Sequence, residues 1–127
     1  LTSTAYAAEN SDARSSEFFW RSSVWLTKIS SNEFRSCFDV TCFGIMEEVG
    51  ARTIKIQKST DGVNWTTMMT CSKESSTYLI DRNTAGHTAC VSYTGSVGYY
   101  YRAVFVLYAK NSSGVGEMTV YSNILKL

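Results

Sequence analysis

The chain has 127 residues, and its 12 Lys and Arg are balanced by 11 Asp and Glu that are scattered rather than grouped. One domain is expected, since a chain of this length buries roughly 65–68% of its surface on folding. The even charge gives no basic surface for nucleic acid or anionic membrane, and no apolar run reaches the ~20 residues that cross a bilayer. Neither nucleic-acid binding nor membrane insertion is therefore expected.

Residues 1–17 are mostly small, polar or charged, and we expect them to form a flexible lead-in to a folded domain at residues 18–127. Ala5, Tyr6 and Ala7 match the small-x-small pattern at the end of secretory signals, a pattern that also arises by chance. A signal remnant and a chance tripeptide both stay open. Four cysteines favour export, so a secreted or cell-surface protein is expected.

Two apolar clusters open the domain, one at residues 18–20 and the other at residues 24–26. The second is expected to begin the first strand, at residues 24–30. The first cluster either packs across the core or stays exposed for a partner. Packing of Trp20 against the core is the simpler expectation.

Alternating side chains predict the next strand at residues 34–46. We expect residues 47–50 to turn the chain and residues 52–58 to form a strand with Ile54 and Ile56 inward. Asp61 and Gly62 are a strong hairpin signal, so residues 65–71 return antiparallel. In the 34–46 strand, the inward set is Phe34, Phe38, Val40 and Cys42, and the outward set is Arg35, Cys37, Asp39 and Thr41.

Two weaker strands follow at residues 77–81 and 88–93, joined by a turn at residues 83–86. Residues 98–110 read as a central strand because they are apolar at both parities, and residues 118–125 return beside them as a hairpin. Seven to eight short strands without a helical period predict an all-β domain, a two-sheet antiparallel β-sandwich.

Two segments resemble a known family. Residues 55–65, Lys-Ile-Gln-Lys-Ser-Thr-Asp-Gly-Val-Asn-Trp, resemble the third-to-fourth strand hairpin of bacterial fibronectin type III-like domains, and residues 101–114 are similar to their sixth strand. Residues 98–102, Gly-Tyr-Tyr-Tyr-Arg, resemble small secreted domains of Gram-positive bacteria. The resemblance covers residues 52–125 and implies a fibronectin type III or immunoglobulin-like sandwich. The four cysteines, the absence of Pro and the aromatic N-terminal segment depart from that family, which leaves the topology open.

The cysteines predict a disulfide rather than a metal site. Cys37 and Cys42 on one extended strand would face opposite sides roughly 16–17 Å apart, too far for a shared zinc ion or, unless a bulge intervenes, for a bridge. Of the three possible pairings we expect Cys71–Cys90, which would contribute about 3 kcal/mol. The pairing of Cys37 and Cys42 stays open, and no metal or cofactor is expected.

Catalytic chemistry is hard to build from this sequence. His87 is the only histidine and lies in a turn-like segment, so a Ser-His-Asp arrangement has no local support. Glu47 and Glu48 are adjacent, and Asp61 serves the hairpin, so no carboxylate pair indicates glycoside hydrolysis. We expect a protein that is not an enzyme.

Surface aromatics remain as candidate binding groups. In the central strand Tyr99, Tyr101, Ala103, Phe105 and Leu107 share one parity, expected to be the core, and the other parity presents residue types that dominate binding hot spots. Burial of that second face under the N-terminal aromatic cluster is an open alternative. The candidate binding residues are Trp20, Arg21, Trp25, Tyr100, Arg102 and Tyr108.

The expected function is that of a secreted or surface protein-binding module of bacterial origin that recognises a host protein. The resemblance to small secreted domains, rather than any motif, makes immunoglobulin the first candidate. The alternative is a carbohydrate-binding module in which Trp20, Trp25 or Tyr100 stacks on sugar rings of host or dietary glycans. A structural spacer within a larger surface protein is a third possibility.

Overall fold

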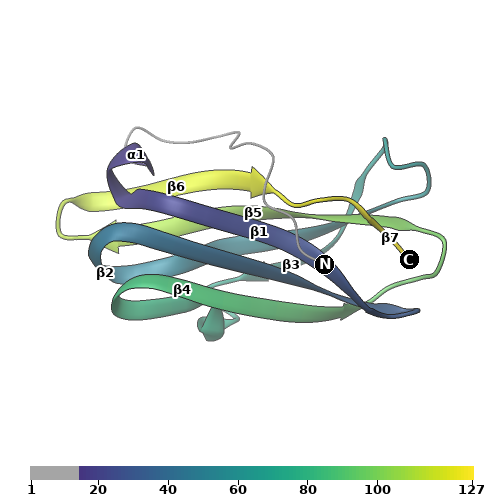
Figure 1. Cartoon of the computed structure of the whole chain (residues 1–127), viewed down its shortest axis with the longest axis horizontal. Coiled ribbons are helices and arrows are strands. Elements are labelled where there is room, and N and C mark those ends of the chain that lie inside the picture. The colour runs from purple at the N-terminus through teal and green to yellow at the C-terminus, as the bar shows by residue number, and fades with distance from the viewer. Residues whose placement is uncertain (1–14) are drawn as a thin grey trace.

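The computed structural model describes residues 15–127, so the signal-like tripeptide at residues 5–7 and most of the predicted lead-in, residues 1–14, lie outside the described residues. All strand pairings in this part are antiparallel. The elements, shown in Figure 1, are the short helix α1 (Ser15–Phe18), β1 (Phe19–Ser30), β2 (Glu33–Ser59), β3 (Thr66–Ser72), the 3-10 turn η1 (Thr77–Leu79), β4 (Ile80–Thr94), β5 (Tyr100–Asn111), β6 (Gly114–Tyr121) and β7 (Leu125–Lys126).

The long strand β2 organises the sheet. Its first half, residues 33–42, lies between β1 and the C-terminal part of β4. Its second half pairs with β5 along one side, and with the start of β4 and then β3 along the other. Strands β6 and β7 continue the sheet from β5. The result is one seven-stranded sheet, curled into a half-barrel because β2 and β4 bend together at one end of the molecule (Figure 1).

The prediction of an all-β antiparallel domain is confirmed, with seven strands in the described chain. The hairpin of β5 and β6 is confirmed, as is the hairpin around Asp61 and Gly62 that joins β2 to β3. A division of these strands into two packed sheets is not confirmed, because β2 continues from one half of the sheet into the other.

The predicted turn at residues 47–50 is wrong, since β2 runs through it. Glu48 and Gly50 pair with Arg82 and Ile80 of β4. Gly50 has a φ of 154°, and a Cβ at this position would overlap the carbonyl oxygen of Leu79. The glycine is thus explained by the close approach of the chain entering β4, not by a turn.

The predicted turn at residues 83–86 is also wrong, because β4 is continuous from Ile80 to Thr94. Asn83 adopts a φ of 55°, and the register between β4 and β2 shifts between Thr41 and Met46. A Cβ at Gly86 would lie 2.7 Å from the Val40 carbonyl oxygen. These turn-forming residues therefore occupy the bend of the curled sheet.

The core lies on the concave face and follows the predicted alternation. Tyr101, Phe105 and Leu107 of β5 are fully buried, which confirms the inward parity of the central strand. The inward sets of β2 are buried as well. Phe34 packs on Tyr101 with ring centroids 4.7 Å apart, and Phe38 meets Phe105 edge to face at 6.2 Å. Each such side chain contributes about 1.5–3 kcal/mol by burial.

The C-terminal segment ties the two arms of the curled sheet together. Asn123 accepts a hydrogen bond from the Leu26 backbone amide at 2.8 Å and donates one to the Leu26 carbonyl at 3.3 Å. The Asn123 side-chain amide thus pairs with the backbone of one residue at the edge of β1, as a residue of a neighbouring strand would. Phe18 of α1 packs against Gly116 of β6, where a Cβ would lie 2.5 Å from its ring.

The disulfide joins Cys37 to Cys90, so the predicted Cys71–Cys90 pairing is wrong. Cys37 and Cys90 lie opposite each other on β2 and β4, with their Cα atoms 4.1 Å apart. Cys71 pairs instead with Ile54 on the second half of β2, and its sulfur lies 4.0 Å from the Tyr93 hydroxyl. Cys42 and Cys71 are free thiols.

Candidate binding surfaces

The outward face of β5 is covered rather than free. Arg102 lies between two rings, with its guanidinium carbon 4.5 Å from the centroid of Trp65 and 4.9 Å from that of Tyr121. Its Nε donates a hydrogen bond to Gln57 Oε1 at 2.7 Å. The cover comes from Trp65 and Tyr121, and not from the N-terminal aromatic cluster that the sequence left as an alternative. Arg102 is engaged within the protein.

Replacing Arg102 by Met should lower the free energy of unfolding by about 1–2 kcal/mol, because two cation–π contacts and a charged hydrogen bond are lost. Urea denaturation measures this loss. Lys55→Met is the matched control, since Lys55 is exposed on β2 next to β5 and makes no ion pair in the described chain. Equal stability of the two variants would contradict the packing role of Arg102.

Tyr108 is enclosed at the other end of the same face. Its side chain is 6% exposed, its hydroxyl bonds to Glu48, and the Lys73 ammonium lies 5.0 Å from its ring centroid. Burial, followed by the negative charge of Glu48, raises the pKa of Tyr108. Burial alone would raise the pKa of Glu48, but Arg82, bonded at 2.6 Å, together with Tyr108 and Lys73, lowers it. The ring therefore belongs to a packed ion-pair cluster.

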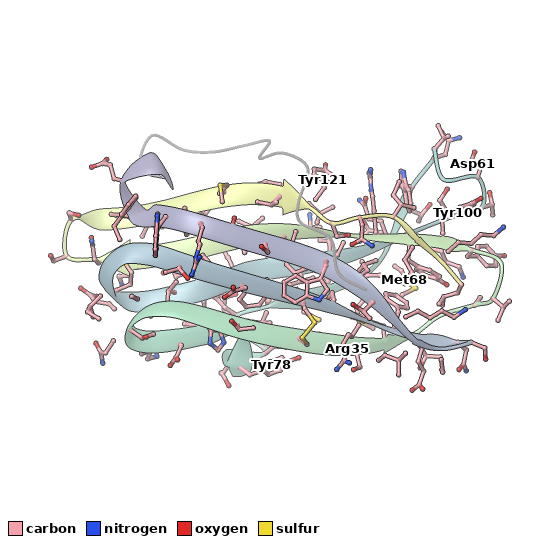
Figure 2. The ribbon with its side chains drawn as sticks, in the orientation of Figure 1. Arg35, Asp61, Met68, Tyr78, Tyr100 and Tyr121 are labelled. Atoms are coloured by element: carbon pink, nitrogen blue, oxygen red, sulfur yellow. A yellow bond between two sulfur atoms is a disulfide. The ribbon has the colours of Figure 1, made fainter. Side chains whose placement is uncertain are left out.

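Tyr100 and Trp25 lie apart from each other. Figure 2 shows Tyr100 beside Asp61 at the end of the molecule remote from α1. Its half-buried ring packs against Gly62, and the Lys126 ammonium lies 5.2 Å from its centroid. Trp25 is half-buried on β1 and pairs in register with Cys37, beside the disulfide. The six candidate residues therefore do not form one site.

Trp20 and Arg21 form part of an exposed apolar surface at the bend of the sheet, near α1. A register shift between Phe19 and Arg21 turns Trp20 outward, 57% exposed, so the expected packing of Trp20 against the core is wrong. The Phe43 ring lies 6.5 Å from that of Trp20, and the Arg21 guanidinium carbon lies 4.8 Å from the Trp20 centroid. Phe43 is 65% exposed and Ile45 is 69% exposed. We name Trp20, Arg21, Phe43 and Ile45 the bend patch.

The bend patch exists because the ladder is interrupted there. The pairing of β2 with β4 passes from Thr41 directly to Met46, and its pairing with β1 ends at Cys42. Residues 43–45 thus have no paired residue in β1 or β4, and all three are exposed. Sequence reasoning missed Phe43 and Ile45, although they continue the outward parity of the 34–46 strand.

His87 lies within β4 and not in the turn expected from the sequence. Its Nε2 donates a hydrogen bond to the Tyr78 carbonyl oxygen at 2.7 Å, and its Nδ1 lies 3.8 Å from a carboxylate oxygen of Asp81. Among residues 15–127 no cluster of three or more His, Cys, Asp or Glu side chains suits a metal ion. The contacts of His87 are those of a side chain that joins β4 to η1.

No described helix is long and apolar enough to span a membrane. Comparison of the chain with protein-family models and with curated proteins found no match.

Proposed function

We propose that this protein is a non-enzymatic binding module, secreted or held at the cell surface, that contacts a protein partner through the bend patch. The observation that carries the proposal is the exposure of Trp20, Phe43 and Ile45, each more than half accessible, at one end of the sheet. Clustered exposed apolar side chains are rare on monomers and mark interaction sites. Trp and Arg are also the residue types most enriched in binding hot spots.

A protein partner suits this surface better than a glycan. Sugar recognition by stacking needs a free ring face with hydrogen-bonding groups beside it, whereas Arg21 already lies over the Trp20 ring. Phe43 and Ile45 add only apolar area. The half-buried Trp25 and Tyr100 give the glycan alternative no further support.

One feature supports export, and a second agrees with the resemblance to fibronectin type III-like domains. The Cys37–Cys90 disulfide is typical of oxidising compartments. The two arms of the curled sheet would then correspond to the two layers of a fibronectin type III or immunoglobulin-like sandwich. The resemblance of residues 98–102 to small secreted bacterial domains makes a host protein the proposed partner and immunoglobulin the first one to test.

Trp20→Ser combined with Phe43→Ser should weaken binding to immobilised polyclonal immunoglobulin roughly a thousandfold, because hot-spot residues contribute about 2 kcal/mol or more each. Biolayer interferometry measures the change. Tyr78→Ser is the matched control: Tyr78 is 51% exposed, outside the patch, and should bind as the unmodified protein does.

Retention of serum proteins on the immobilised unmodified protein and its variants tests the identity of the partner and the role of the bend patch independently. If the unmodified protein and Tyr78→Ser retain a serum protein other than immunoglobulin and the patch variant does not, the partner assignment is wrong and the binding function stands. If the patch variant retains the same proteins in the same amounts, the bend patch is not the contact surface.

A further inference from the structure

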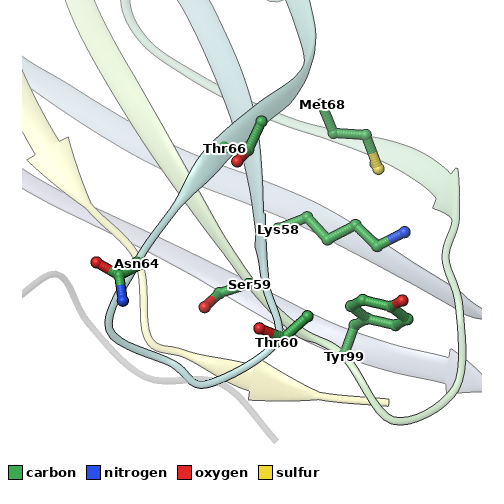
Figure 3. Close-up of a pocket in the computed structure, with 7 residues that line it drawn as sticks. All are labelled: Lys58, Ser59, Thr60, Asn64, Thr66, Met68 and Tyr99. Atoms are coloured by element: carbon green, nitrogen blue, oxygen red, sulfur yellow. The ribbon is translucent and has the colours of Figure 1, made fainter.

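A second surface, far from the bend patch, has the form of a ligand site. It is a groove of about 410 Å³ between the end of β2, the start of β3 and the residue that precedes β5. Figure 3 shows the Lys58 side chain extending between those of Met68 and Tyr99. Its volume lies within the range of small-molecule sites.

The loop that forms one wall of the groove is held in shape by Asp61. The Asp61 carboxylate accepts hydrogen bonds from the backbone amides of Val63 and Asn64 at 2.8 and 2.9 Å. It also accepts bonds from the Asn64 side-chain amide and the Ser59 hydroxyl, both at 2.8 Å. These bonds, led by the backbone amides of Asn64 and Val63, hold the pKa of Asp61 well below its usual range. The wall is therefore formed before any ligand arrives.

Lys58 is the one charged side chain that lines the groove in the described part of the chain. The Lys58 ammonium lies 4.1 Å from the centroid of the Tyr99 ring. In the part of the chain that the structure describes, Lys58 has no carboxylate within ion-pair distance, and no Asp or Glu lines the groove. An anionic group is the ligand feature that complements this ammonium.

The rest of the lining suits a ligand rich in hydroxyl groups. Thr60, Asn64 and Thr66 are exposed and carry hydroxyl or amide groups that donate and accept hydrogen bonds. Met68 supplies apolar surface for the carbon skeleton, and the Tyr99 ring holds the Lys58 ammonium in the groove. A simple anion would use the ammonium and leave most of the groove empty.

We propose that this groove binds an acidic saccharide, with the sugar carboxylate on the Lys58 ammonium and the ring hydroxyls on Thr60, Asn64 and Thr66. The site is separate from the bend patch, so the proposal does not rest on the proposed protein-binding function. A variant with Trp20→Ser and Phe43→Ser should therefore keep saccharide binding.

Titration of the isotope-labelled full chain with glucuronic acid, followed by amide NMR shifts, tests this proposal. Saturable shifts are expected at residues 58–60, 64–66 and 99. Lys58→Met should weaken binding roughly tenfold or more, since a charged hydrogen bond is lost. Thr66→Val should weaken it less. Lys55→Met is the matched control because alternation places Lys55 on the opposite face of β2, and its affinity should be unchanged.

Two further probes decide the ligand class. Methyl glucoside carries the hydroxyls without the charge, and acetate carries the carboxylate without the ring; both should bind at least roughly tenfold more weakly than glucuronic acid. If methyl glucoside binds as tightly as glucuronic acid, the proposed role of Lys58 is wrong. If acetate binds as tightly as glucuronic acid, the groove is a site for simple anions and the saccharide assignment is wrong. Absence of saturable shifts at the groove in a well-folded spectrum would overturn the proposal.

Discussion

Replacing Cys37 and Cys90 together by Ala should lower the free energy of unfolding by about 4 kcal/mol. The two cysteines are 53 residues apart, and a loop of that size is expected to restrict the unfolded chain by this amount in the chain-entropy model. Domains of this kind are stable by only about 5–15 kcal/mol, so the loss would remove at least about a quarter of the free energy of unfolding. Urea denaturation of the oxidised protein and of the double variant measures the difference.

Cys71→Ala is the control for removing a cysteine that forms no disulfide. Cys71 is half-buried, and its replacement should lower the free energy of unfolding much less. Thiol counting checks the pairing itself. The unreduced, unfolded protein should show two reactive thiols, and the native protein should react at Cys71 first, because burial raises the pKa of Cys42 to about 11. Four thiols before reduction, or a labelled Cys37, would contradict the Cys37–Cys90 bridge.

Gly50→Ala should destabilise the fold by about 3–5 kcal/mol, the range of the most damaging single substitutions. The added methyl group would overlap the carbonyl oxygen of Leu79, and the φ of 154° at this position is one that L-residues rarely adopt. A backbone atom cannot move aside alone, so the entry of β4 would have to separate from β2. Thermal and urea denaturation measure the loss.

Gly44→Ala is the matched control, because a Cβ at Gly44 meets nothing within 4 Å. Its stability should stay within about 0.5 kcal/mol of the unmodified protein. If Gly50→Ala fails to fold while Gly44→Ala folds normally, the close approach of the two strands is supported. Equal stability of both variants would contradict it.

Much of the fold could be predicted from side-chain alternation. The parity of β5 and of the first half of β2 identified the buried residues, and Asp61 with Gly62 identified a hairpin. The bend could not be predicted. Residues 47–50 and 83–86 contain residue types that are common in turns, but they lie within the continuous strands β2 and β4. Local sequence does not distinguish a reversal of the chain from a sharp curl in a paired strand.

The disulfide and the candidate binding surfaces could not be predicted, because they depend on how strands far apart in the sequence pair with each other. Cys37 faces Cys90 only because β2 and β4 pair across 53 residues, which spacing alone does not reveal. Arg102 was predicted to face outward, and the rings that enclose it come from two other segments of the chain. Trp20 is exposed because β1 shifts register beside it. Phe43 is the next outward position after Thr41 in the predicted 34–46 strand, so side-chain alternation could have identified it.

Hydrogen exchange of the protein bound to polyclonal immunoglobulin tests most directly whether the bend patch is the contact surface. We expect slower exchange at the backbone amides of residues 19–21 and 42–46, with unchanged exchange at residues 58–66. Protection confined to the groove or to β5, or no protection at the bend at saturating immunoglobulin, would contradict it.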